Sequence, residues 1–180
     1  MGYIKKKSAI QEKRTAKEFG GKTQVASGAL WGSKGDVRTG AERTSSFNDS
    51  DYLIENKYTD KDSYKLDRKI WEKIVQEAIR DNFRTPLLQV DIQDLQLVII
   101  SHNDFIALFE DYNNIEYRMF ATENNSIVLK KNELNRSINV SLGSSKIPVF
   151  VIEFLEKVGE KRYLKLAMML KEEYLTACNI

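Results

Sequence analysis

Residues 51–59, DYLIENKYT, have the composition of a β-strand but carry charges where a buried strand would carry apolar side chains. Side chains alternate between the two faces of a strand, so Glu55 and Lys57 project from one face and Ile54 and Asn56 from the other. Two charges on one face of an apolar strand cost free energy unless they are paired or bind a metal ion. The stretch therefore predicts either a functional pair or a solvated edge strand.

A third charged residue upstream favours the functional interpretation. Asp36 stands at the start of another predicted strand, residues 35–39. If the two strands are neighbours, the carboxylates of Asp36 and Glu55 converge, and the Lys57 ammonium lies one pleat further on. Two carboxylates are the ligands that a hard cation such as Mg²⁺ or Mn²⁺ selects. Lys57 would then orient or help deprotonate an attacking water, or stabilise charge on a phosphorus centre.

The rest of the chain predicts a mixed α/β layout with no internal repeat. Helices are expected where apolar residues recur at helical spacing, and strands where β-branched runs are bounded by turn residues. The predicted helices cover residues 8–19, capped by Ser8, and residues 63–83, 102–112 and 161–175. The predicted strands cover residues 23–27, 35–39, 51–59, 85–92, 95–101, 126–134, 137–144 and 147–154, of which 85–92 and 95–101 could form a hairpin.

Composition excludes several kinds of site. Of the 180 residues, only Cys178 is a cysteine, so the sequence offers neither an internal disulfide nor a cysteine metal site. His102 is the only histidine, which argues against a Ser-His-Asp triad and a histidine-rich metal site. No signal peptide or run of roughly 18 apolar residues is seen, so we expect no membrane association and a cytoplasmic protein.

The net charge of +2 hides an asymmetry along the chain. Residues 1–43 hold ten Lys and Arg against four acids, about +6, which leaves about −4 for the remainder. A basic end favours a polyanionic partner such as nucleic acid, although a solvated charged surface would give the same composition.

The pattern G-D…E-x-K, formed here by Gly35-Asp36 and Glu55-Asn56-Lys57, resembles the PD-(D/E)xK nuclease superfamily. Within it, the archaeal-type and phage-borne Holliday-junction resolvases are most similar, over residues 5–101. The likeness rests on a first helix with the acid Glu12, a Ser/Gly-rich approach to Asp36, the E-x-K strand followed by a helix, and the next pair of strands. Three features depart from the family: Gly35 replaces its proline, residues 27–36 are longer, and residues 40–50 are inserted.

The resemblance implies a fold and a division of the chain. It implies a restriction-endonuclease-like α/β core, with a mixed central sheet flanked by helices, over residues 1–112. Residues 113–180 would form a C-terminal α+β extension packed on the core, which we expect to provide a dimer interface or a lid over DNA.

It also implies roles for individual residues. The catalytic residues would be Glu12, Asp36, Glu55 and Lys57. The ligands of Mg²⁺ or Mn²⁺ would be Asp36, Glu55, the main-chain carbonyl of Asn56, and Glu12 directly or through water. The DNA contacts would be Lys5, Lys6, Lys7, Lys13, Arg14, Lys65 and Lys69, with Ser27 or Ser33 on the scissile phosphate. The alternative for each is an ordinary surface charge or a loop serine.

The expected function is therefore a Mg²⁺-dependent endodeoxyribonuclease that resolves four-way DNA junctions, leaving 5′-phosphate and 3′-hydroxyl ends as the family does. Two paired nicks on a symmetric junction require two active sites at a fixed separation, which predicts a two-fold homodimer. The alternatives are another PD-(D/E)xK endonuclease of restriction, nicking or repair type, and a non-catalytic nucleic-acid-binding protein.

Overall fold

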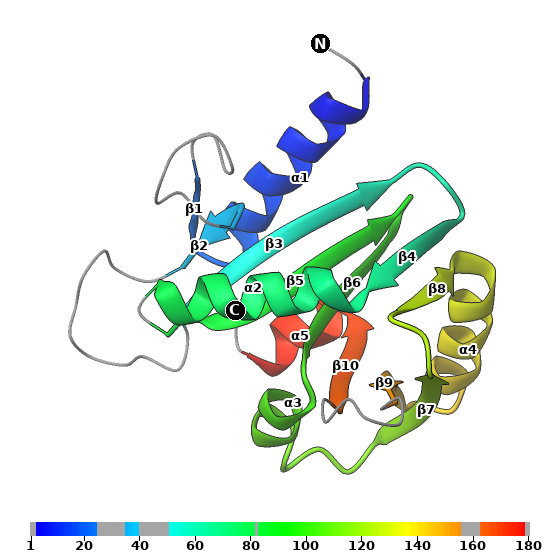
Figure 1. Cartoon of the computed structure of the whole chain (residues 1–180). Helices are drawn as coiled ribbons and strands as arrows, with labels where there is room; N and C mark the ends of the chain where they lie inside the picture. The colour runs from blue at the N-terminus through cyan, green and yellow to red at the C-terminus, as the bar shows by residue number, and fades with distance from the viewer. Residues whose placement is uncertain (1–2, 25–34, 40–50, 82, 156–162, 179–180) are drawn as a thin grey trace.

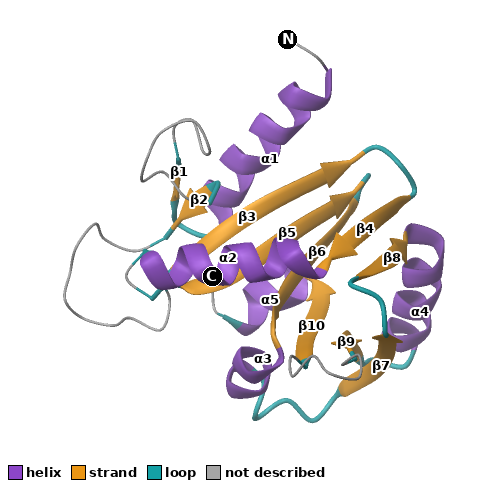
Figure 2. Cartoon of the chain, in the orientation of Figure 1, coloured by secondary structure: helices purple, strands orange, loops and turns teal. Residues whose placement is uncertain are grey.

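The computed structural model describes residues 3–24, 35–39, 51–81, 83–155 and 163–178. These residues form a mixed sheet with helices on both faces (Figures 1 and 2). The helices are α1 (Tyr3–Glu18), α2 (Arg68–Arg80), α3 (His102–Leu108), α4 (Lys131–Gly143) and α5 (Lys171–Ala177). The strands are β1 (Lys22–Thr23), β2 (Val37–Arg38), β3 (Tyr52–Thr59), β4 (Ser63–Asp67), β5 (Thr85–Ile92), β6 (Leu95–Ser101), β7 (Ile115–Thr122), β8 (Ser126–Lys130), β9 (Ile147–Phe154) and β10 (Leu164–Leu170).

Eight strands make one continuous sheet in the order β1-β2-β3-β5-β6-β10-β9-β7. β3 runs parallel to β5, and β7 runs parallel to β9, while the other neighbours in the sheet are antiparallel. A separate antiparallel ribbon joins β4 to β8. The sheet is therefore mixed, as predicted, and the hairpin of β5 and β6 is confirmed.

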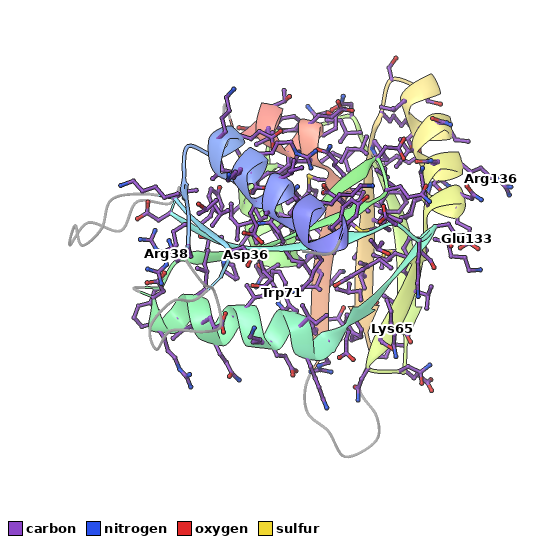
Figure 3. All side chains as sticks on the ribbon, turned by 90° about the horizontal axis from the view of Figure 1, so that it is seen from above. Asp36, Arg38, Lys65, Trp71, Glu133 and Arg136 are labelled. Atoms are coloured by element: carbon purple, nitrogen blue, oxygen red, sulfur yellow. The ribbon has the colours of Figure 1, made fainter. Side chains whose placement is uncertain are left out.

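Apolar residues fill both faces of this sheet, because its central strands are buried on each side. One cluster holds Ala16 of α1 and Phe105 of α3, packed with Tyr174 of α5 against the sheet. The other holds Trp71 of α2 and Ile138 of α4. Figure 3 shows α1 and α2 on opposite sides of the strands, with Trp71 directed from α2 toward the sheet. The molecule thus has three layers, helix, sheet and helix.

The sheet also crosses the boundary that was expected at residue 112. Residues 113–180 supply β7, β9 and β10, and β10 pairs directly with β6 of the preceding segment. Both apolar clusters contain side chains from each side of that position. Residues before and after position 112 therefore belong to the same sheet and pack into the same two apolar clusters.

Three sequence predictions of secondary structure are wrong, and the reason in each case is tertiary pairing. Residues 63–67 were expected in a helix but form β4, because they pair with β8. Residues 137–144 were expected as a strand but belong to α4, which packs Ile138 into the core. Residues 161–175 were expected as one helix, yet Leu164–Leu170 is strand β10 and only Lys171–Ala177 is helical.

Two further differences are smaller. α1 begins at Tyr3, so Ser8 lies inside the helix and does not cap it. β7 was not predicted at all, although its burial alternates along the strand. In the part of the chain that the structure describes, no helix has both the length and the apolar character needed to cross a membrane.

Candidate active site

β2 and β3 bring Asp36 beside Glu55, as the sequence predicts. The two strands pair antiparallel. The Asp36 N–H donates to the Ile54 carbonyl at 2.9 Å, and its carboxylate Oδ2 accepts a hydrogen bond from the Asn56 N–H at 2.7 Å. Figure 3 shows Asp36 where the short β2 meets the edge of the sheet. Asp36 is thereby held against the edge of β3, next to the backbone of Glu55.

The main-chain carbonyl of Asn56 faces the same edge. In an extended strand the N–H and C=O of one residue point to the same side. Since the Asn56 N–H points to Asp36, its C=O is directed to that side as well. The pairing of β2 with β3 ends at Ile54, and no other described strand pairs with this edge beyond it. The Asp36 carboxylate and the Asn56 carbonyl are therefore oxygens on the same edge of β3, beyond its last described pair with β2.

Glu55 and Lys57 neutralise each other on one face of β3. Lys57 Nζ lies 2.7 Å from Glu55 Oε1. Glu55 is 9% exposed, and Lys57 is partly exposed. The two charges are tolerated on this strand because they form an ion pair at the margin of the core.

Glu12 joins these three residues from α1. Burial raises the pKa of its carboxyl above the ordinary value of 4.5, and the negative charges of Asp36 and Glu55 raise it further. The positive charge of Lys57 acts in the opposite direction. Screening by salt limits such effects to about 10 Å, so Glu12 of α1 lies in the neighbourhood of Asp36, Glu55 and Lys57.

Polar contacts fix the face of α1 that carries Glu12. The Gln11 side chain donates from Nε2 to the Lys57 carbonyl at 3.0 Å. The Thr15 hydroxyl donates to the Asn56 side-chain oxygen at 2.9 Å. Gln11 and Thr15 are both buried. These bonds lock the helix onto β3, and they explain why Glu12 points toward the acidic pair.

Tyr64 is a neighbour that the sequence analysis missed. It lies on β4 and packs against the core, and its buried hydroxyl has no hydrogen-bond partner among the described residues. Burial raises its pKa to about 12, with added contributions from the charges of Glu55 and Asp67. Because residues 63–83 were expected as a helix, Tyr64 was not placed beside Glu55. The alternation of β4, if recognised, would have been the signal.

Gly35 explains the departure from the family pattern. Its φ is +65°, in the left-handed region, where a proline with φ near −65° cannot stand. A Cβ at this position would lie 2.6 Å from Leu53 Cδ1. The turn before Asp36 thus requires glycine in this chain for both conformation and space.

Two of the basic residues expected to bind DNA already have acidic partners. Lys7 Nζ lies 2.8 Å from Asp60 Oδ1, on exposed side chains. Arg14 donates to the buried Asp91 carboxylate of β5. Both residues therefore help attach α1 to the sheet, whatever else they contact.

Of the other residues expected to contact DNA, the structure describes the side chains of some and not of others. Lys13 on α1, Lys65 on β4 and Lys69 on α2 are exposed, and Figure 3 shows where Lys65 lies. Lys5 and Lys6 belong to α1, but their side chains lie outside the described part of the chain. Ser27 and Ser33 also lie outside the described residues.

The oxygen ligands of Asp36, Glu55 and Asn56 suit a hard divalent cation. Two carboxylates and a main-chain carbonyl are oxygen ligands of the kind Mg²⁺ takes, with water completing its shell. Among the described residues, no three acidic, histidine or cysteine side chains converge as a ready-made metal site. Glu12, Asp36 and Glu55 therefore do not form a closed three-carboxylate cage. Asp36 and Glu55 fit the cation as the side-chain ligands, and Glu12 fits an outer position.

The raised pKa of Glu12 predicts how the stability of the protein depends on pH. An acid whose pKa is higher in the folded state favours folding when protonated, and this stability is lost as pH rises through the folded pKa. Glu12→Gln is expected to raise the unfolding temperature by about 1–3 °C at about pH 7 without divalent metal, and by less at about pH 4. The measurement is thermal unfolding followed by circular dichroism in EDTA at both pH values.

The matched control for Glu12→Gln is the same substitution in an Asp36→Asn background. There the stabilisation at neutral pH should shrink, because one of the charges that raises the Glu12 pKa has been removed. An equal gain at both pH values would contradict the proximity of Glu12 to the acidic pair.

Comparison with known proteins adds no relative. No protein-family model matches the sequence, and no curated protein matches it. The chemistry of the site therefore has to be argued from the residues themselves.

Proposed function

We propose that this protein is a Mg²⁺-dependent DNA endonuclease that resolves four-way junctions. One observation carries the proposal: Glu12 of α1, Asp36 before β2 and the Glu55–Lys57 pair of β3 come from three separate segments and lie within electrostatic reach of one another at the edge of β3. A chance E-x-K on a solvated strand would bring neither a carboxylate from β2 nor one from α1 to that edge.

The order of elements supports the finer proposal of a restriction-endonuclease-like core. α1 precedes the antiparallel β1, β2 and β3, and α2 then connects β3 to the parallel strand β5. This is the arrangement in which the superfamily resemblance places the acid, the E-x-K strand and the following helix. The likeness is one of architecture, and function is argued from the site alone.

Each residue has a role that its position allows. Asp36, Glu55 and the Asn56 carbonyl would hold the Mg²⁺ ion, which when bound supplies a Lewis acid and a more acidic water. Lys57 would orient the attacking water or stabilise negative charge on the phosphate, since its ammonium lies on the face of β3 that Glu55 shares. Glu12 would hold an outer-shell water in place, and its high pKa suits an exchange of protons with that water.

DNA is the substrate that the charge distribution favours. The basic N-terminal segment includes α1, which also supplies Glu12, and the exposed Lys13 lies on the same helix. Phosphate contacts from lysines position the backbone without reading its sequence. A branched substrate would then be selected by shape, and two symmetric nicks would need a homodimer.

The test is cleavage of a synthetic four-way junction beside a linear duplex of the same arm sequence. We expect cleavage with Mg²⁺, no cleavage in EDTA, and preference for the junction by at least about tenfold, about 1.4 kcal/mol of discrimination. Equal cleavage of both substrates would favour a restriction-, nicking- or repair-type endonuclease. Junction binding without cleavage in either Mg²⁺ or Mn²⁺ would favour a non-catalytic binding protein.

A further inference from the structure

β7 forms one end of the eight-stranded sheet, and among the described residues no strand pairs with its outer edge. The Ile147 N–H donates to the Asn114 carbonyl, and the Leu155 N–H to the Thr122 carbonyl, each at 2.8 Å. In a parallel ladder, alternate residues direct both backbone groups to the same neighbour. Even-numbered residues of β7 therefore bond to β9, and odd-numbered residues point away from it. The outward-directed residues are Ile115, Tyr117, Met119 and Ala121.

The side chains of these same residues form an apolar row. Tyr117 is 53% exposed and Met119 is 56% exposed. The Tyr117 ring is supported from behind by Phe105 of α3, edge to face, at 6.1 Å between centroids. No described strand pairs with this edge, where β7 ends the sheet order. A flat edge strand with exposed apolar side chains is a surface that pairs readily with another strand.

The opposite face of β7 carries one acid and one base. Glu116 and Arg118 flank Tyr117, and Arg118 Nη2 lies 2.7 Å from Glu116 Oε1. Both side chains are partly exposed, at 26% for Glu116 and 38% for Arg118. Glu116 and Arg118 thus lie at equal distances on either side of Tyr117 and carry opposite charges.

We infer that β7 pairs with β7 of a second copy of this chain, antiparallel and centred on Tyr117. A two-fold axis through Tyr117 makes the two tyrosines a hydrogen-bonded pair and sets Ile115 opposite Met119 of the second copy. Glu116 of each copy then lies opposite Arg118 of the other copy, so the interface contains two such pairs. These are the non-hydrogen-bonded positions, in which side chains approach most closely. One register therefore satisfies the backbone, the apolar row and both charges.

Neighbouring registers fail on charge. Hydrogen bonding needs an odd-numbered residue opposite an odd-numbered one, so the centre can only shift by whole residues along β7. A centre at Glu116 sets two glutamates face to face, and a centre at Arg118 sets two arginines face to face. Like charges directly opposite each other destabilise a strand pair. Of the registers centred on residues 116, 117 and 118, only the one centred on Tyr117 therefore sets opposite charges against each other.

This inference stands apart from the proposed nuclease activity. β7 lies roughly 25 Å across the sheet from β3, at about 4.8 Å per strand, so substitutions in β7 do not touch the candidate active site. It deepens the proposal only by naming the surface through which the expected homodimer forms. Failure of the dimer and failure of cleavage are separate results, because the test below measures mass and not activity.

The experiment uses charge reversal in the full-length chain, read by sedimentation equilibrium. Wild type is expected to be a concentration-dependent dimer, with a dissociation constant on the order of micromolar for so small an interface. Glu116→Arg and Arg118→Glu should each raise that constant about tenfold or more, because two attractive pairs become repulsive. The double variant Glu116→Arg/Arg118→Glu should restore it, since the charges are opposite again.

A mixture of the two single variants gives the sharpest result. Glu116→Arg mixed with Arg118→Glu should form a heterodimer in preference to either homodimer, detected by native mass spectrometry with one variant isotopically labelled. The control is Ile79→Arg, an exposed position of α2, which packs on β3 and β5 toward the other end of the sheet and should leave the dimer unchanged. Circular dichroism checks that each variant folds. A wild-type monomer at all concentrations, or a dimer indifferent to these charges, would overturn the inference.

Discussion

Asp36→Asn and Glu55→Gln should each reduce Mg²⁺-dependent cleavage of a four-way junction by about 10³-fold or more. Cation binding needs the carboxylate charge, which the amide lacks although it has nearly the same shape. Junction binding should remain within about threefold of wild type, because contacts to the phosphate backbone come from Lys and Arg. The measurements are single-turnover cleavage at saturating enzyme and a binding titration with Ca²⁺ in place of Mg²⁺.

Two features of the structure make this a fair comparison. An asparagine at position 36 keeps an oxygen to accept the Asn56 N–H, so the β2–β3 contact can survive the substitution. The matched controls are Asp94→Asn and Glu133→Gln, two exposed acids that pair with lysines far from the site. Figure 3 shows Glu133 projecting from α4. If either site variant keeps more than a small fraction of activity in Mg²⁺, the metal-site assignment is wrong.

Lys57→Ala should slow cleavage by about 10²–10³-fold while leaving the affinity for divalent metal at least as high as in wild type. The substitution removes the ammonium 2.7 Å from Glu55, and with it a positive charge that also lowers the pKa of Glu12. A cation should therefore bind no less well, and the lost rate should appear only in the chemical step. Mn²⁺ titration followed by electron paramagnetic resonance measures the affinity separately from activity.

Lys57→Arg tests whether charge alone is sufficient. A guanidinium is planar and larger than an ammonium and does not give up its proton, so we expect it to recover less than about a tenth of the lost rate. The control is Lys73→Ala, an exposed lysine of α2 that pairs with Glu77. If Lys57→Ala cleaves at the wild-type rate, the E-x-K interpretation falls, and the ion pair on β3 serves only to neutralise a buried acid.

The predictions that the structure confirmed lie where local signals and tertiary packing agree. β3, β5 and β6 match the expected strands within one residue at their ends. Each has a compact β-branched or leucine-rich run between turn residues, and β5 and β6 are joined by a short turn and pair with each other. α2 was recognised from its apolar stripe, although its first turn was placed too early.

Most of the errors lie beyond residue 112, where periodicity is ambiguous. Leu164–Leu170 forms β10 between β6 and β9, buried on both faces, so it lacks the alternation that marks a half-exposed strand. A continuous apolar run of this length fits a buried helix equally well. β4 lies earlier in the chain, and it is a strand because β8, more than fifty residues further on, pairs with it. Its alternation of apolar and polar residues covers only five positions, too few to indicate that pairing by itself.

The sequence by itself determined the mixed α/β class, the charged strand, and the four residues Glu12, Asp36, Glu55 and Lys57 as one candidate site. Apart from Glu12, which the resemblance to PD-(D/E)xK nucleases added, those inferences rest on side-chain alternation and residue type, which are local properties. Only the tertiary structure decided that Glu12 reaches the acidic pair, that Arg14 is engaged by the buried Asp91, and that β7 ends the sheet with an open edge. The physical reason is that burial and charge act through space, between residues that the chain order keeps far apart.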